Sequence, residues 1–421
     1  APGESMDGPI LSLFFPRANT DREARREWLL ARAALGATLL PGPAPAFPFA
    51  YNNWYTTRFD FDGAFLRGQQ EALAPYTFDY FIVDAGWYEA CGQWRPDPNK
   101  FNPGEFEGIL HDIKNAGVKI GIWSCPQFVR ADANALPPEV DQPGFYRKFI
   151  DGWLLDYAGM DFTKFLLDHV AALRANYAMD WWKYDQDFFT ESTRHGVMKN
   201  VVALQNALTA VRLAQPDLVI EDCQSGGRML NDFTAMLAQT HWIRDGGNTG
   251  PEHARSNLRE SLGALEILPP WGVNRWLNNP DQNDPEDDEF MRLYCRASMC
   301  GAWGLVADLR KVTPPQRDVI VKEVANYRRL NTLKAACRYD ILPCDKGANA
   351  AGIVYYDASG THAGVLLFRW DTRRAFKCRV PLDGLAEGAF AIHDVDTGTD
   401  STAPSNRSEE HTSELQSHHD L

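Results

Sequence analysis

From residue 47 onward, short apolar stretches alternate with longer segments whose apolar residues recur at the helical period. The short stretches are bounded by turn residues, which is typical of buried strands. Strands that alternate with helices indicate βαβ units and a parallel sheet. Six strands are expected at residues 49–54, 80–84, 119–124, 181–185, 218–222 and 241–245. We expect a seventh near residues 266–270 and an eighth near residues 299–307.

Helices are expected between these strands at residues 58–73, 106–115 and 161–177, with a closing helix at residues 314–330. Six apolar side chains of the third helix share one face: Phe162, Phe165, Leu166, Val170, Leu173 and Tyr177. Eight successive units predict an α/β fold, a (β/α)8 TIM barrel over residues 47–335 with right-handed crossovers. A doubly wound open sheet is the alternative, but no Gly-x-Gly-x-x-Gly turn supports a nucleotide-binding fold.

The two ends of the chain depart from this pattern. Residues 1–46 contain an expected helix at 19–35 and a Pro-rich connector, and we interpret them as the remnant of an N-terminal domain with a linker helix. Residues 336–402 consist of short strands between turns, which predicts an incomplete antiparallel β-sandwich. Residues 403–421 resemble the translation of a sequencing-library adapter, so we expect a disordered, artefactual tail without function.

Composition and charge narrow the range of functions. A net charge of −14 argues against nucleic acid or an anionic membrane as partner. No apolar run is long enough to span a membrane and no signal segment is apparent, so we expect a cytoplasmic protein. The eight cysteines show neither CxxC pairing nor zinc spacing with His, so we expect free thiols, no metal and no other cofactor. The 13 tryptophans fit both sugar binding and core packing.

One stretch, residues 180–188, concentrates charge against aromatic surface. Two tryptophans lead into Lys183, Asp185 and Asp187 at the end of an expected strand. A buried Lys–Asp pair that only fixes strand geometry would explain these residues, because buried charges need partners. The carboxyl end of a barrel strand would explain them equally well, because catalytic side chains stand there.

Polar and aromatic residues also end the other expected strands, and this favours the catalytic interpretation. They are Asn52, Asn53 and Trp54; Asp84, Gly86 and Trp87; Trp123; Glu221, Asp222 and Cys223; and Arg244, Asp245 and Asn248. Carboxylates among tryptophans, without a catalytic triad or metal spacing, point to glycoside chemistry. That chemistry needs one carboxyl at the anomeric carbon and another that protonates the departing oxygen.

The ordered motifs resemble glycoside hydrolase family 36, the melibiase-type α-galactosidases. They are Tyr-Asn-Asn-Trp at 51–54, Ile-Val-Asp-Ala-Gly-Trp-Tyr at 82–88, Gly-Ile-Trp at 121–123, Lys-Tyr-Asp at 183–185, Cys-Gln-Ser-Gly-Gly-Arg at 223–228 and Trp-Ile-Arg-Asp at 242–245. The resemblance covers roughly residues 10 to 400. It implies a retaining exo-acting α-glycosidase, with an oligosaccharide or glycoside as partner.

The resemblance also implies roles for particular residues. Asp185 matches the nucleophile and Asp245 the general acid/base. The residues that match or lie within the substrate-binding motifs are Trp54, Asp84, Trp87, Trp123, Lys183, Cys223, Ser225, Gly226, Gly227 and Arg228. The positive charge of Lys183 is expected to keep Asp185 ionised. Asp187 is the rival nucleophile, because it lies two residues further on the same strand face.

The chain departs from the family pattern at three places. Ala85 stands where a second aspartate is usual, the run at residues 124–127 lacks a usual glutamate, and Asp187 replaces a usual asparagine. A transglycosidase of the raffinose-synthase kind and a non-catalytic carbohydrate-binding barrel remain alternatives. The sequence leaves open the glycone, the linkage and whether the chain forms a homo-oligomer.

Overall fold

The structure is a computed structural model of the chain. It describes residues 15–17, 20–44, 46–130, 146–149, 152–185, 194–245, 251–278, 288–342, 350–369, 380, 382 and 384–405. None of the helices in this part of the chain combines the length and apolar character that a membrane crossing requires. The six cysteines that fall within it are free thiols.

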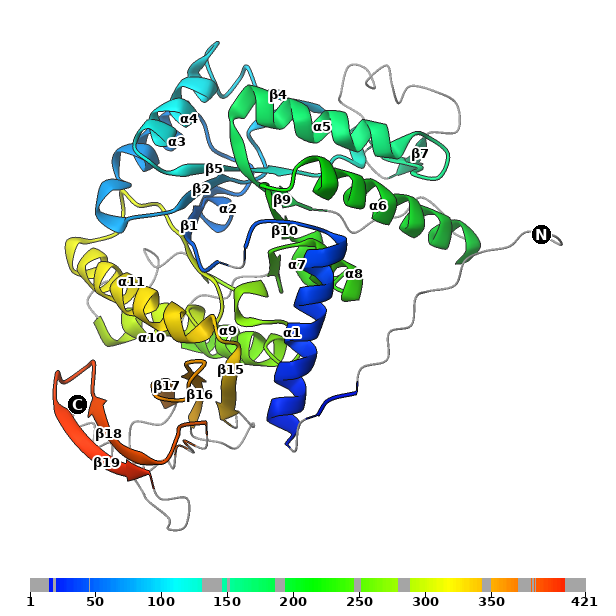
Figure 1. The fold of residues 1–421 in the computed structure, drawn as a ribbon. Helices are drawn as coiled ribbons and strands as arrows, with labels where there is room; N and C mark the ends of the chain where they lie inside the picture. Colours follow the sequence, from blue (N-terminus) through cyan, green and yellow to red (C-terminus); the bar gives the residue numbers. More distant parts are fainter. Residues whose placement is uncertain are drawn as a thin grey trace.

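A parallel β-sheet curves into a nearly closed barrel at the centre of the molecule (Figure 1). Its strands are β1 (Phe49–Asn52), β2 (Tyr80–Val83), β5 (Lys119–Ser124), β9 (Met179–Tyr184), β10 (Val219–Asp222), β11 (Thr240–Trp242), β12 (Val273–Asn274), β13 (Leu277–Asn278) and β14 (Trp303–Val306). The strand order is β12-β11-β10-β9-β5-β2-β1-β14-β13. The predicted TIM barrel is therefore confirmed.

The seventh position of the barrel is shared by two short strands. β12 pairs with β11, and β13 pairs with β14. The prediction of a strand at residues 266–270 was wrong, because β12 begins only at Val273 and a 3-10 turn occupies Pro270–Gly272. Pro269 and Pro270 lack the backbone N–H that an interior strand must donate, so the ladder begins beyond them.

Helices cover the outside of the barrel (Figure 1). They are α3 (Gly63–Glu71), α4 (Glu105–Asn115), α5 (Phe162–Tyr177), α6 (Arg194–Ala214), α8 (Asp232–Leu237), α9 (Pro251–Ala264), α10 (Asp288–Ser298) and α11 (Pro314–Lys334). The predicted apolar face of α5 is buried except for the partly exposed Phe165. Thr313 and Gln316 form a capping box that starts α11.

Two small antiparallel sheets, inserted after barrel strands at the mouth, were not predicted. A hairpin of β3 (Tyr88–Ala90) and β4 (Gln93–Pro96) follows β2. A small antiparallel sheet of β6 (Phe128–Arg130), β8 (Gly152–Leu155) and β7 (Tyr146–Phe149) follows β5. Both stand where loops follow the carboxyl ends of strands.

Strand alternation decides which residues of β9 face the barrel interior. Trp181 belongs to an aromatic cluster inside the barrel, whereas Trp182 and Tyr184 pack in the main core. Successive side chains alternate between the two faces of a strand. Lys183 and Asp185 therefore follow Trp181 along the interior face, toward the mouth.

The segments before and after the barrel pack against each other and against its helices. Helix α1 (Asp21–Leu39) is tied to β15 by an ion pair between Arg22 and Asp340 at 2.5 Å. The C-terminal part consists of antiparallel strands, as predicted: β15 (Arg338–Leu342), β16 (Ala350–Tyr356) and β17 (Ala363–Arg369) form one sheet. A hairpin of β18 (Gly388–His393) and β19 (Asp400–Ser405) follows, and its second strand was not predicted. β19 continues past the predicted boundary at residue 402, and residues 406–421 lie outside the described residues.

Candidate active site

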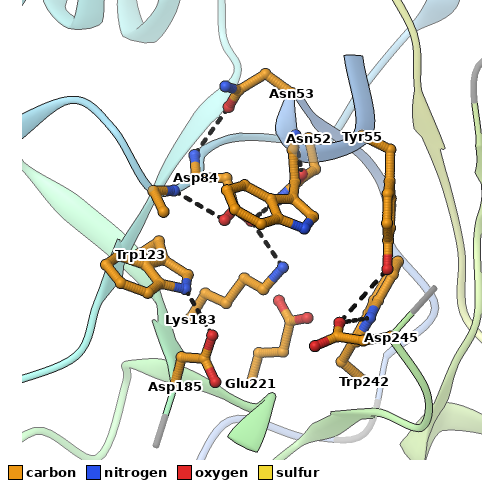
Figure 2. A network of polar contacts seen from close by, with 12 residues as sticks. Asn52, Asn53, Tyr55, Asp84, Trp123, Lys183, Asp185, Glu221, Trp242 and Asp245 are labelled. Atoms are coloured by element: carbon orange, nitrogen blue, oxygen red, sulfur yellow. Dashed lines mark hydrogen bonds and ion pairs between the residues drawn. The ribbon is translucent and has the colours of Figure 1, made fainter. Parts of the chain in front are cut away.

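Polar side chains from six strands converge at the carboxyl end of the barrel (Figure 2). Asn52 ends β1, while Asp84 and Asp185 directly follow β2 and β9. Asp245 lies three residues after β11. This is the end of a TIM barrel at which catalytic groups are found.

Asp185 is held by two N–H donors, one on each carboxylate oxygen. The backbone N–H of Ser225 donates to Oδ1 at 2.8 Å, and the indole Nε1 of Trp123 donates to Oδ2 at 3.0 Å. Burial raises the pKa of Asp185 to about 6, although the Ser225 hydrogen bond and the charge of Lys183 act in the opposite direction. Lys183 thus favours the ionised form, as expected, but burial outweighs the lysine in the net shift.

A left-handed turn brings Ser225 to Asp185. Four consecutive residues, 224–227, have φ between +44° and +78°. A Cβ on Gly226 would lie 2.0 Å from the backbone nitrogen of Asp245, so only glycine permits this approach. The turn thus supports both carboxylates, one by a hydrogen bond and the other by backbone contact.

Lys183 and Asp84 form a buried ion pair. Lys183 Nζ donates to Asp84 Oδ2 at 2.7 Å, and both side chains are under 5% exposed. Asn52 Nδ2 donates to the same oxygen at 2.6 Å, and Asn53 Oδ1 accepts from the backbone N–H of Asp84 at 2.8 Å. Burial alone lowers the pKa of Lys183, but Asp84 and further anionic neighbours raise it well above its ordinary value. The lysine is therefore a permanent cation.

Asp245 is contacted by two aromatic donors that were not predicted as site residues. Trp242 Nε1 donates to Asp245 Oδ1 at 3.0 Å, and the hydroxyl of Tyr55 lies 3.4 Å from the same oxygen. Trp242 begins the Trp-Ile-Arg-Asp motif at 242–245, and Tyr55 directly follows the Tyr-Asn-Asn-Trp motif at 51–54. The Trp242 contact is local, whereas the Tyr55 contact joins strand ends 190 residues apart, so only the folded barrel reveals it.

A fourth carboxyl, Glu221, lies in the barrel interior below these groups (Figure 2). It accepts from Trp181 Nε1 at 2.8 Å and from Asn274 Nδ2 at 3.3 Å. Burial raises its pKa to about 7, even though Lys183 opposes this shift. Glu221 was expected at a strand end, without a role in the site.

The remaining residues of the sequence prediction take different positions. Trp87 is 0% exposed, and its indole donates to the carbonyl of Trp123 at 3.0 Å, so it supports the site from within the core. Trp54 packs edge-on against Phe59 at 4.9 Å. Cys223 is buried, and burial raises the pKa of its thiol well above the ordinary value. Arg228 is exposed. Asp187 and Asn248 lie outside the described residues.

A family model named Melibiase matches residues 44–336, more than half of the chain. The chain belongs to the melibiase family. The match spans the barrel and includes every strand that contributes to the site.

Individual melibiase relatives are distant in sequence and longer than this chain. Alpha-galactosidase 1 of Pediococcus pentosaceus is 21% identical over 350 residues, which cover 76% of this chain and 46% of that protein. AgaA of Geobacillus stearothermophilus is 20% identical over 355 residues, with the same coverage. The chain thus spans about half the length of these curated relatives.

Solved melibiase structures show the same fold. The structure of AgaA superposes with a TM-score of 0.74 at 18% identity, covering 91% of this chain and 57% of that one. The galactosidase domain of an alpha-galactosidase-sucrose kinase, AgaSK, gives a TM-score of 0.73 at 18% identity, with coverages of 90% and 57%. AgaA variants have been solved in complex with stachyose and with raffinose.

Two of the three departures from the expected family pattern lie beside the site. Ala85 is buried next to Asp84, so no second carboxylate accompanies that residue. Gln127 is fully buried, and its Nε2 lies 3.3 Å from the backbone carbonyl of Asp185. The run at 124–127 thus packs behind Asp185 instead of offering a carboxylate there.

Proposed function

We propose that the chain is a retaining exo-acting α-glycosidase of the α-galactosidase type, which hydrolyses terminal α-galactosides through a covalent glycosyl-enzyme intermediate. The observation that carries the proposal is the pair of aspartates, Asp185 and Asp245, at the mouth of a melibiase barrel. Their environments differ, because Asp185 is fixed by one donor on each oxygen whereas both donors of Asp245 meet a single oxygen. Two carboxyls with different surroundings suit two different roles.

In the proposed reaction, Asp185 attacks the anomeric carbon while Asp245 protonates the departing oxygen. Asp245, now ionised, then takes a proton from a water molecule, and the water displaces Asp185 from the sugar. With a pKa of about 6, Asp185 is mostly ionised at neutral pH, as a nucleophile must be. Its two N–H donors fix the carboxylate in one orientation, which supports in-line attack.

The charged pair of Lys183 and Asp84 would bind hydroxyls of the terminal sugar. Each side chain retains hydrogen-bonding capacity beyond the bond between them, since an ammonium has three donors and a carboxylate about four acceptor sites. Trp123 would form a wall of the pocket, and the turn at residues 223–227 would lie near the sugar 2-hydroxyl. An oligosaccharide ending in an α-galactoside is the proposed substrate.

A panel of nitrophenyl α-glycosides tests the glycone, and NMR of the first product tests retention of anomeric configuration. Asp185→Ala should abolish turnover of every substrate, and added azide should restore it with a glycosyl azide of inverted configuration as product. Asp245→Ala should slow substrates with poor leaving groups far more than activated ones, because only the former need a proton.

Three results would contradict the proposal. Inverted product from the wild-type enzyme would exclude a retaining mechanism. Full activity of Asp185→Ala together with loss of activity in Asp187→Ala would move the nucleophile to Asp187. Transfer of the glycosyl group to an added sugar in preference to water would indicate a transglycosidase.

A further inference from the structure

Tyr55 and Trp242 form a stacked aromatic pair beside Asp245. Their ring centroids are 6.1 Å apart at an interplanar angle of 29°. Tyr55 stands in α2 (Trp54–Thr57), directly after β1, and Trp242 ends β11. Trp242 is 2% exposed and packs edge-on against Trp276 at 5.5 Å. The two residues therefore lie at the carboxyl ends of two different barrel strands.

Both residues donate a hydrogen bond to the same oxygen of Asp245. The Trp242 indole lies 3.0 Å from Oδ1, and the Tyr55 hydroxyl lies 3.4 Å from it. Figure 2 shows the second carboxylate oxygen turned away from both donors, on the side of Glu221 and Asp185. An oxygen that accepts two hydrogen bonds does not also hold the acid proton, so the two oxygens of Asp245 are chemically distinct.

We infer that Tyr55 and Trp242 are positioning residues for the acid/base: they hold Oδ1 of Asp245 as an acceptor, so that Oδ2 carries the proton delivered to the departing oxygen. This inference rests on the proposed function, in which Asp245 is the acid/base. Donors on Oδ1 stabilise the ionised form of Asp245, which is the form that must activate water in the second step. They also prevent rotation of the carboxyl that would turn the proton away from the sugar.

Other charged and titratable groups also act on Asp245. Asp185 and Cys223 face it from the ends of β9 and β10, and both interact with it electrostatically. Arg244 precedes it, but its guanidinium pairs with Glu260 on α9. Trp242 also lies under the ammonium of Lys183, 4.9 Å from the ring centroid. Replacement of Trp242 would therefore disturb the lysine as well, and Tyr55 provides the cleaner test.

The experiment compares the full-length wild-type protein with Tyr55→Phe, which removes one hydroxyl. The pH dependence of kcat/KM is measured on an α-galactoside with a poor leaving group, for which the proton of Asp245 is required. Without the Tyr55 donor the ionised form of Asp245 is less stable, so the alkaline limb should move up by about 0.5–1 pH unit. The acidic limb, set by Asp185, should stay in place.

Tyr177→Phe is the matched control, because that hydroxyl donates to the backbone carbonyl of Trp94 at 3.1 Å and not to Asp245. It should leave the alkaline limb where it is. In an Asp245→Ala background, Tyr55→Phe should cause no further loss with the poor leaving group.

The inference would be overturned if the alkaline limb of Tyr55→Phe does not move and kcat/KM falls equally for substrates with good and poor leaving groups. Tyr55 would then serve only in packing. Failure of the proposed function looks different. In that case wild-type protein shows no glycosidase activity, or Asp245→Ala does not discriminate between leaving groups.

Discussion

Removal of the carboxylate of Asp84 should destabilise the fold as well as impair the site. From the sequence alone, Asp84→Ala is expected to spare the fold, because residues at a barrel mouth add little to the core. The structure changes this expectation, since Asp84 and Lys183 are both buried and pair at 2.7 Å. Asp84→Ala leaves a buried cation without its nearest counter-ion, which costs about 3–5 kcal/mol.

The size of the barrel sets the observable shift. For a barrel of about 290 residues the entropy of unfolding is about 0.6 kcal/mol/K, so one kcal/mol lowers the Tm by about 1.6 °C. Asp84→Ala should therefore lower the Tm by about 5–8 °C. The pKa of Lys183 is raised in the folded state, so the lysine stabilises the fold at pH values below its unfolded pKa of about 10.4. That stabilisation is lost only as pH rises through the folded pKa. The difference should therefore persist across the neutral range.

The assay is thermal unfolding followed by circular dichroism, with activity measured in parallel. The double variant Asp84→Ala with Lys183→Met should recover most of the Tm, because an apolar pair replaces the ion pair, but it should stay inactive. Asp168→Ala is the control: it removes an exposed partner of Lys164 and should cost no more than about 1 kcal/mol. If Asp84→Ala unfolds at the wild-type temperature, the buried pair does not stabilise the fold as we argue.

Three further predictions follow from the same geometry. Activity should rise with pH along an acidic limb near 6, the pKa of Asp185, because the nucleophile must be ionised; a limb set instead near 4 in kcat/KM would contradict this value. Gly226→Ala should destroy activity and lower the Tm, since its Cβ would meet the Asp245 backbone nitrogen, whereas Gly263→Ala, with open space at its Cβ, should do neither. Because the pKa of Glu221 is raised to about 7, the folded state binds more protons than the unfolded state between the unfolded pKa and pH 7, so the free energy of unfolding should fall as pH rises through this range. Glu221→Gln should weaken this pH dependence, which urea unfolding at several pH values measures.

The linear order of apolar and polar residues specified the barrel and the place of its chemistry. The alternation of apolar stretches and helical segments predicts every strand of the barrel but the seventh, because hydrophobic periodicity records which face of an element is buried. It also places Lys183 and Asp185 on one face of β9, since the side-chain period of a strand is two. Strand ends of a parallel barrel meet at one rim, so the sequence is sufficient to group Asp84, Asp185 and Asp245 there.

Packing in three dimensions determined which of these residues touch and how they ionise. Trp87 and Trp123 both stand at or beyond strand ends. Trp87 packs in the core against Phe106 of α4 and Tyr177 of α5, whereas Trp123 donates a hydrogen bond to Asp185. Tyr55 reaches Asp245 across 190 positions of sequence. The neighbouring Lys183 favours a low pKa for Asp185, but burial by the whole barrel raises it. Local patterns specify elements, whereas desolvation and contacts between elements arise only when the complete chain has packed.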